Sequence, residues 1–225
     1  MINKFILSIS LLSSFIALAQ KDKTFRSIEN AKSQPDSVYI LDLSIKSLTT
    51  IPESINEFKN LRILKLSYNR LSNLPQSITK LRHLEELYLT NNNLTKLPKD
   101  IGNLSNLKVL DLTNNSLESF PHSMSNCIEL KELRAGRNEF EHLPNCITQL
   151  TELSKLILES NNIITLPNDI DNLKKLQHFD INGNKISSLP ASISQLHELT
   201  IFKAGGNNLF SLPDDFGNLA KLERL

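Results

Sequence analysis

The chain has 225 residues, and its 25 lysines and arginines nearly balance its 24 aspartates and glutamates. This balance leaves no global field to attract nucleic acid or an anionic membrane surface, so no nucleic-acid partner is predicted. The length suits one ordinary domain. Only six glycines and no tryptophan occur, a bias that indicates a repeated template and makes internal repeats the first feature to seek.

The first nineteen residues have the features of a secretory leader. Lys4 supplies a positive n-region, residues 5–18 are mostly apolar, and residues 17–19 form an A-x-A cleavage site. A membrane-spanning helix needs ~20 apolar residues, more than this stretch holds. Residues 1–19 are therefore predicted to be a signal peptide, and no later segment could cross a bilayer. We expect a protein that is secreted, periplasmic or located at the cell surface.

Residues 20–37 contain a short apolar pattern. Phe25, Ile28 and Ala31 would share one face of a helix, with Thr24 in front of them as its N-cap and Pro35 beyond its end. We predict that this segment is an N-terminal capping helix for the structure that follows.

From residue 38 onward the sequence repeats every 23 residues without an insertion. The template is L-x-x-L-x-L-x-x-N-x-L-x-x-L-P-x-x-I-x-x-L-x-x, which gives eight repeats over residues 38–221 and the start of a ninth over 222–225. Template position 15 is always proline: Pro52, Pro75, Pro98, Pro121, Pro144, Pro167, Pro190 and Pro213. Position 9 is asparagine in all repeats except the first, which has Lys46: Asn69, Asn92, Asn115, Asn138, Asn161, Asn184 and Asn207.

Each part of the template predicts a local structure. Around positions 4 to 6 apolar and polar residues alternate, which is typical of a short strand with one buried face. The later L-P-x-x-I-x-x-L part spaces its apolar residues by three and four, as a helical or 3₁₀ turn does, and proline can begin such a turn without losing a hydrogen bond. One repeat alone buries too little, so we expect stability to come from stacked neighbours.

The asparagine column has two interpretations. A row of amides could bind a ligand, but its place just after the strand and before an apolar residue favours a buried turn. There each amide would satisfy backbone groups of adjacent coils. We predict a structural role for these seven residues.

These patterns resemble the leucine-rich repeat superfamily, in its 23-residue subclass with the L-P-x-x-I-x-x-L signature, over residues 38–225. The resemblance implies an α/β fold: a curved, right-handed solenoid with a parallel sheet on its concave face and 3₁₀ or short helical turns on its convex face. It also supports the cap, because similar short helices precede the first strand in related bacterial proteins. The subclass includes intracellular Ras-binding scaffolds and secreted bacterial proteins, and the leader favours the secreted kind.

Positions 2, 3, 5, 7 and 8 of each repeat are expected to form the concave face, which is large enough for a protein interface. Tyrosines flanked by aliphatic residues there are typical interface anchors, although tyrosine also suits a strand by its β-propensity. A basic group in repeat 5 could meet an acidic partner, or belong to a solvated mixed-charge surface. The candidate partner-binding residues are Ile63, Tyr68, Tyr88, Val109, Lys131, Arg134, Arg137 and Ile157.

Signals for catalysis or cofactors are poor. His178 and Asp180 would share the concave face near Ser154 and Ser160, but no strained nucleophile turn accompanies them. The five histidines fall at five different template positions, so no metal column is predicted, and no glycine loop for phosphate occurs. We expect neither an enzyme nor a cofactor or metal site.

The two cysteines occupy different template positions. Cys127 replaces a core leucine, whereas Cys146 precedes a core isoleucine and is expected to face outward. We predict that they are unpaired.

At the end of the sequence, Leu222 and Leu225 begin a ninth repeat that stops before its strand is complete. We expect either a fragment of a longer protein or an edge that pairs with another chain. The favoured function is protein binding through the concave face. The alternatives are a structural or adhesive surface protein, a polysaccharide binder, or the recognition part of an enzyme whose catalytic domain lies elsewhere.

Overall fold

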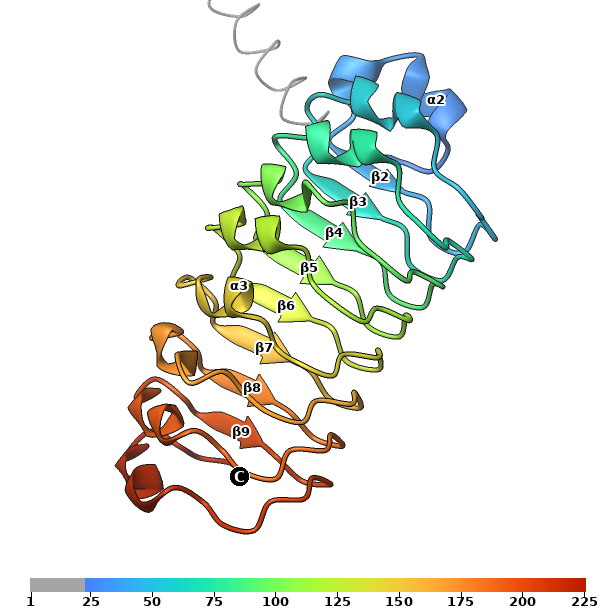
Figure 1. Ribbon diagram of the computed structural model, residues 1–225. Coiled ribbons are helices and arrows are strands. Elements are labelled where there is room, and N and C mark those ends of the chain that lie inside the picture. Colours follow the sequence, from blue (N-terminus) through green and yellow to red (C-terminus); the bar gives the residue numbers. More distant parts are fainter. Residues whose placement is uncertain (1–22) are drawn as a thin grey trace, which may run out of the picture.

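The computed structural model describes residues 23–225, so the predicted signal peptide lies outside the described residues. The described chain is an elongated stack of coils built on one sheet, in which nine parallel strands follow each other in chain order (Figure 1). Short helical turns lie on the opposite side of the stack. The predicted solenoid is therefore confirmed, with one strand and one helical turn in each coil.

All strands are short, and from β2 to β9 each covers template positions 3 to 5. They are β1 (Thr24–Phe25), β2 (Ile40–Asp42), β3 (Ile63–Lys65), β4 (Glu86–Tyr88), β5 (Val109–Asp111), β6 (Glu132–Arg134), β7 (Lys155–Ile157), β8 (His178–Asp180) and β9 (Ile201–Lys203). From β2 to β9 the register joins identical template positions, as in Leu64 to Leu87 and Leu87 to Leu110. The middle residue of each of these strands points inward and is buried.

One helical turn follows each strand from β2 to β9, and two lie between β1 and β2. They are α2 (Ile28–Lys32), η1 (Pro35–Ser37), η2 (Glu53–Glu57), η3 (Gln76–Lys80), η4 (Ile101–Asn103), η5 (His122–Asn126), α3 (Asn145–Thr148), η6 (Ile170–Asn172), η7 (Ala191–Gln195) and η8 (Asp214–Asn218). From η2 onward a template proline precedes each of these turns. In each repeat the carbonyl of the template proline accepts a hydrogen bond from the amide three residues later. For example, Ile55 N–H donates to Pro52 O at 3.1 Å.

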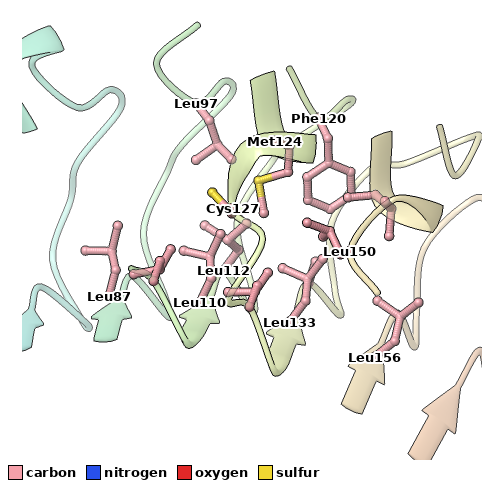
Figure 2. Close-up of a cluster of buried hydrophobic side chains, with 14 of the residues drawn as sticks. Leu87, Leu97, Leu110, Leu112, Phe120, Met124, Cys127, Leu133, Leu150 and Leu156 are labelled. Carbon is pink, nitrogen blue, oxygen red and sulfur yellow. The ribbon is translucent and has the colours of Figure 1, made fainter. Parts of the chain in front are cut away.

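The core fills the space between the sheet and the helical turns. Figure 2 shows Leu110 and Leu133 from neighbouring strands facing Met124 and Cys127 from the helical side. Burial of each such large apolar side chain contributes about 1.5–3 kcal/mol relative to its exposure. Because every coil supplies the same inward positions, the core runs without interruption along the stack.

At the N-terminus the prediction that Thr24 caps a helix is wrong. Thr24 and Phe25 instead form β1, which pairs with β2, because that strand offers unpaired backbone groups at its edge. The helix α2 begins at Ile28, and its N-cap is Ser27, whose hydroxyl accepts the N–H of Asn30 at 3.1 Å. Phe25 is buried, as the apolar pattern predicts, but it belongs to strand β1 and not to a helix.

The outward position expected for Cys146 is also wrong, since only 5% of this residue is exposed. Cys146 lies in α3, and α3 packs against η5 of the preceding coil, which covers this template position. Both cysteines are free, in agreement with the prediction. Burial raises the pKa of the Cys127 thiol to about 12 and also raises the pKa of Cys146, so neither is a reactive thiolate at neutral pH.

Candidate partner-binding surface

Outward side chains of the strands form two parallel rows, because the register aligns equal template positions. We call these rows the sheet face; it corresponds to the concave face expected from the sequence. Position 3 contributes Ile40, Ile63, Glu86, Val109, Glu132, Lys155, His178 and Ile201. Position 5 contributes Asp42, Lys65, Tyr88, Asp111, Arg134, Ile157, Asp180 and Lys203. Most of these side chains are partly exposed, so the face is open to a partner.

The predicted apolar patch is interrupted. Glu86 stands between Ile63 and Val109 in the position 3 row. Tyr88 lies in the other row, and its hydroxyl donates to Glu86 Oε2 at 2.8 Å. Burial raises the pKa of Tyr88 to about 12, and the hydrogen bond to Glu86 adds to this. Lys65 Nζ stands 5.9 Å from the centre of the Tyr88 ring, within range of a cation–π contact. Tyr88 is thus held in one orientation by polar neighbours.

Ion pairs between coils organise the charged side chains. Glu85 binds Lys108 at 2.7 Å and Arg62 at 3.1 Å. The hydrogen bond from Lys108 holds the pKa of Glu85 below its usual value, against the opposing effect of burial. Such partly exposed pairs contribute little to stability, but here they align charges from successive coils.

The predicted basic group of repeat 5 is partly neutralised. Glu132 pairs with Arg134 on its own strand and with Lys155 of the next coil at 3.3 Å. Burial alone would raise the pKa of Glu132, but Arg134 and Lys155 together outweigh it and lower the pKa. Lys131, just before β6, is exposed and has no ion pair within residues 23–225. Arg134 and Ile157 lie side by side in the register.

Tyr68 and Arg137 stand away from the strands, on the turn that leaves the sheet. They occupy template position 8, where φ is +58° for Tyr68 and +54° for Arg137. The same left-handed conformation recurs at this position throughout: Ile45, Tyr68, Asn91, Asn114, Arg137, Ser160, Gly183 and Gly206. Asparagine and glycine tolerate it, whereas most other side chains resist it. Asparagine or glycine at position 8 of four repeats was the sequence signal for this left-handed conformation, which the sequence analysis did not predict.

The asparagine column lies behind this turn and joins the coils. Asn138 Nδ2 donates to the carbonyl of Ala135 in its own coil at 3.1 Å and to that of Leu112 in the preceding coil at 3.0 Å. Its Oδ1 accepts the N–H of Leu117 at 3.0 Å. The other six amides repeat this pattern. Their polar atoms are consumed by the backbone, so they offer nothing to a ligand.

Repeats 6 and 7 place Glu159, His178 and Asp180 in one neighbourhood. Asp180 pairs with Lys203 at 3.1 Å, whereas Glu159 Oε2 and His178 Nε2 are buried and find no hydrogen-bond partner among residues 23–225. Burial raises the pKa of Glu159, and it lowers the pKa of His178 with help from Lys155 and Lys203.

Replacement of Glu159 with glutamine should raise the thermal midpoint at pH 7. A carboxyl whose folded pKa is raised costs stability once it ionises, so the wild-type chain loses stability as pH rises from the unfolded pKa through the raised folded pKa. The glutamine side chain avoids that cost. The gain should shrink towards pH 4, where the wild-type carboxyl is also neutral. Midpoints at both pH values, with the exposed Glu141→Gln as control, test this; a gain that is equal at both values would contradict it.

No three or more His, Cys, Asp or Glu side chains of residues 23–225 gather where they could hold a metal ion. Over the same range, no helix has the length and apolar character needed to span a membrane.

The stacked strands, helical turns and asparagine column define a repeat solenoid with an open sheet face. Residues 83–161 and 155–225 match the family model described as leucine-rich repeat region, and residues 36–94 match the one described as leucine rich repeat. The chain therefore belongs to the leucine-rich repeat family. A comparison with the curated proteins gives no match.

Solved structures of the family are similar to this chain over nearly its whole length. A leucine-rich repeat protein of Leptospira interrogans is 29% identical with a TM-score of 0.77, and the match covers 90% of this chain and 65% of that one. The plant peptide hormone receptor RGFR1 in complex with RGF2 is 33% identical with a TM-score of 0.73, covering 89% and 32%. The ectodomain of the Arabidopsis thaliana receptor kinase GASSHO1/SCHENGEN3, in complex with CASPARIAN STRIP INTEGRITY FACTOR 2, is 30% identical with a TM-score of 0.72, covering 89% and 28%.

Proposed function

We propose that this chain is a secreted or surface-exposed binding module, without catalysis of its own, that recognises a protein or peptide through the sheet face. The observation that supports the proposal is that different template positions of each coil have different roles. The leucines pack in the core and the asparagines bind the backbone of the turns, while two rows of varied side chains face outward. N-terminal sequencing of the protein recovered outside the cell tests export. We expect the mature chain to begin at Gln20, and a chain that begins at Met1 would contradict cleavage of the signal peptide.

The chemistry of the sheet face suits an extended ligand. Tyrosine and arginine are the residues most often found at the energetic centres of interfaces, and Tyr88 and Arg134 lie in the same row with Asp111 between them. Their ion-pair and hydrogen-bond partners hold them in place before binding, which lowers the entropy cost of association. Two of the similar plant receptors are in complex with RGF2 and with CASPARIAN STRIP INTEGRITY FACTOR 2, which supports the same use of this fold here.

Selection from a displayed library of random peptides provides the test without knowledge of the natural partner. The affinity of the selected peptides is then measured for the wild-type chain and for the double variant Tyr88→Ala plus Arg134→Ala. We expect at least about a tenfold loss of affinity, because the removal of an interface anchor costs more than 1.4 kcal/mol.

The matched control is Lys80→Ala plus Gln149→Ala, two exposed positions on the helical side of the stack. This variant should bind the selected peptides as the wild-type chain does. Peptides that lose affinity only for the control variant would place recognition on the helical side and contradict the proposal.

A further inference from the structure

A second surface lies where the chain leaves the sheet, at template positions 10 to 13, which we call the strand-exit flank. Along it the position 10 amide of each coil from repeat 2 on donates to the position 11 carbonyl of the coil before. Examples are Arg70 N to Leu48 O at 2.8 Å and Glu139 N to Leu117 O at 2.9 Å. This ladder fixes the spacing of the flank, so its outward side chains form columns at a regular interval.

Charge on the strand-exit flank is segregated along the stack. In repeats 1 to 3 its charged residues are Arg70 and Lys96, with no acidic residue. In repeats 4 and 5 they are Glu118, Glu139 and Glu141, with no lysine or arginine. All five are exposed, and none takes part in an ion pair within residues 23–225. The three glutamates also line one hollow of 640 Å³. Over repeats 1 to 5, this flank therefore has a positive part followed by a negative part, and neither is neutralised by an ion pair within residues 23–225.

A strip with this pattern is complementary to itself when reversed. Consider a twofold axis that lies in the interface along the coil direction, between repeats 3 and 4. It places repeat 2 of one copy against repeat 5 of the other and keeps each template position in its column. Arg70 then faces Glu139, both at position 10, and Lys96 at position 13 faces Glu118 at position 12. Symmetry forms each pair twice, whereas alignment in the same direction would bring like charges together.

We propose that the strand-exit flank is the interface of an antiparallel homodimer. The same operation explains two residues that the sheet face does not use. Tyr68, 59% exposed, and Arg137, also exposed, both occupy the left-handed turn at the margin of the flank. In the dimer the Tyr68 ring of one copy meets the Arg137 guanidinium of the other, an arrangement suited to a cation–π contact.

The expected dimer is weak and sensitive to salt. The interface is a narrow strip of exposed charges, which salt screens within about 10 Å at 0.1 M. Association should therefore rise with protein concentration and fall as ionic strength increases.

Sedimentation velocity of the full chain at low ionic strength, over a range of concentrations, tests the proposal by charge reversal. Arg70→Glu alone and Glu139→Arg alone should each weaken association at least about tenfold, because like charges then meet twice across the axis. An equimolar mixture of the two variants should restore the dimer, since in the mixed pair every substituted position faces the opposite charge. Neither residue is buried, so both variants should fold, which circular dichroism checks.

Lys185→Glu is the matched control, because Lys185 occupies the same column in repeat 7, outside the proposed pairing. It should leave association unchanged. A chain that stays monomeric at every concentration, or a dimer that neither reversal weakens, would overturn the proposal. The peptide-binding measurements use Tyr88 and Arg134 and are independent of this outcome.

Discussion

Replacement of Gly102 with alanine should lower the free energy of unfolding by about 3 kcal/mol, the upper end of the usual cost of overpacking. A Cβ atom at this position would overlap the carbonyl oxygen of Ser123 and stand 2.7 Å from its carbonyl carbon. These are backbone atoms of the next coil, so no side-chain rotation relieves the overlap. Coils 3 and 4 would have to separate, which would also disturb the bond from Gly102 N–H to Ser123 Oγ at 3.2 Å. Chemical denaturation of the two proteins measures the change.

Gly217 provides the control, because it occupies the same template position in repeat 8. A Cβ atom there would meet nothing within 4 Å. Gly217→Ala should therefore be neutral or slightly stabilising, since alanine reduces the freedom of the unfolded chain. Equal effects of the two substitutions would show that the close approach at Gly102 is not what limits stability.

Replacement of Asn138 with alanine should cost about 1–3 kcal/mol, the cost of leaving a buried polar group without a partner. The amide joins the carbonyls of Leu112 and Ala135 and the N–H of Leu117, at 3.0 to 3.1 Å. Alanine leaves all three backbone groups without that partner in a region closed to water. A lower denaturation midpoint is the expected observation.

The adjacent column supplies a comparison for this prediction. Asn93, an exposed asparagine at position 10, makes no side-chain hydrogen bond within residues 23–225. Asn93→Ala should change the midpoint little. An Asn138→Ala protein as stable as the wild-type chain would contradict the role assigned to the column.

Periodicity allowed the fold to be predicted in detail. Eight prolines and seven asparagines in phase identify the coil, and the alternation at positions 4 to 6 identifies its buried strand residues. The turn after the strand was harder, because the left-handed backbone at Tyr68 and Arg137 opposes the preferences of those side chains. Only the asparagines and glycines of other repeats signalled it.

Other features depend on contacts between coils, which no single repeat encodes. Thr24 joins a strand because β2 has a free edge, and Cys146 is buried because α3 meets η5. The gap in the apolar patch follows from the register, which inserts Glu86 between Ile63 and Val109. The sequence likewise did not predict that Glu132 partly neutralises Arg134, because this ion pair depends on where the two side chains lie. Five candidate residues could be placed on the sheet face from the sequence, but their neighbours could not: Ile63, Tyr88, Val109, Arg134 and Ile157.

The two proposed surfaces do not compete. The homodimer uses the strand-exit flank at template positions 10 to 13, whereas Tyr88 and Arg134 lie at position 5 in the strands, so each copy would keep its own sheet face available. A dimer would then present two binding faces, and a partner able to reach both would gain avidity in proportion to its effective local concentration.

Site-specific photo-cross-linking with a selected peptide tests recognition by the sheet face most directly. Benzoylphenylalanine introduced in place of Tyr88 or Ile157 should capture the peptide, because both positions project outward in the position 5 row, from β4 and β7. The same probe in place of Lys80 or Gln149, on the helical side, should capture none. Capture from the helical positions alone would mean that this chain does not recognise its partner through the sheet.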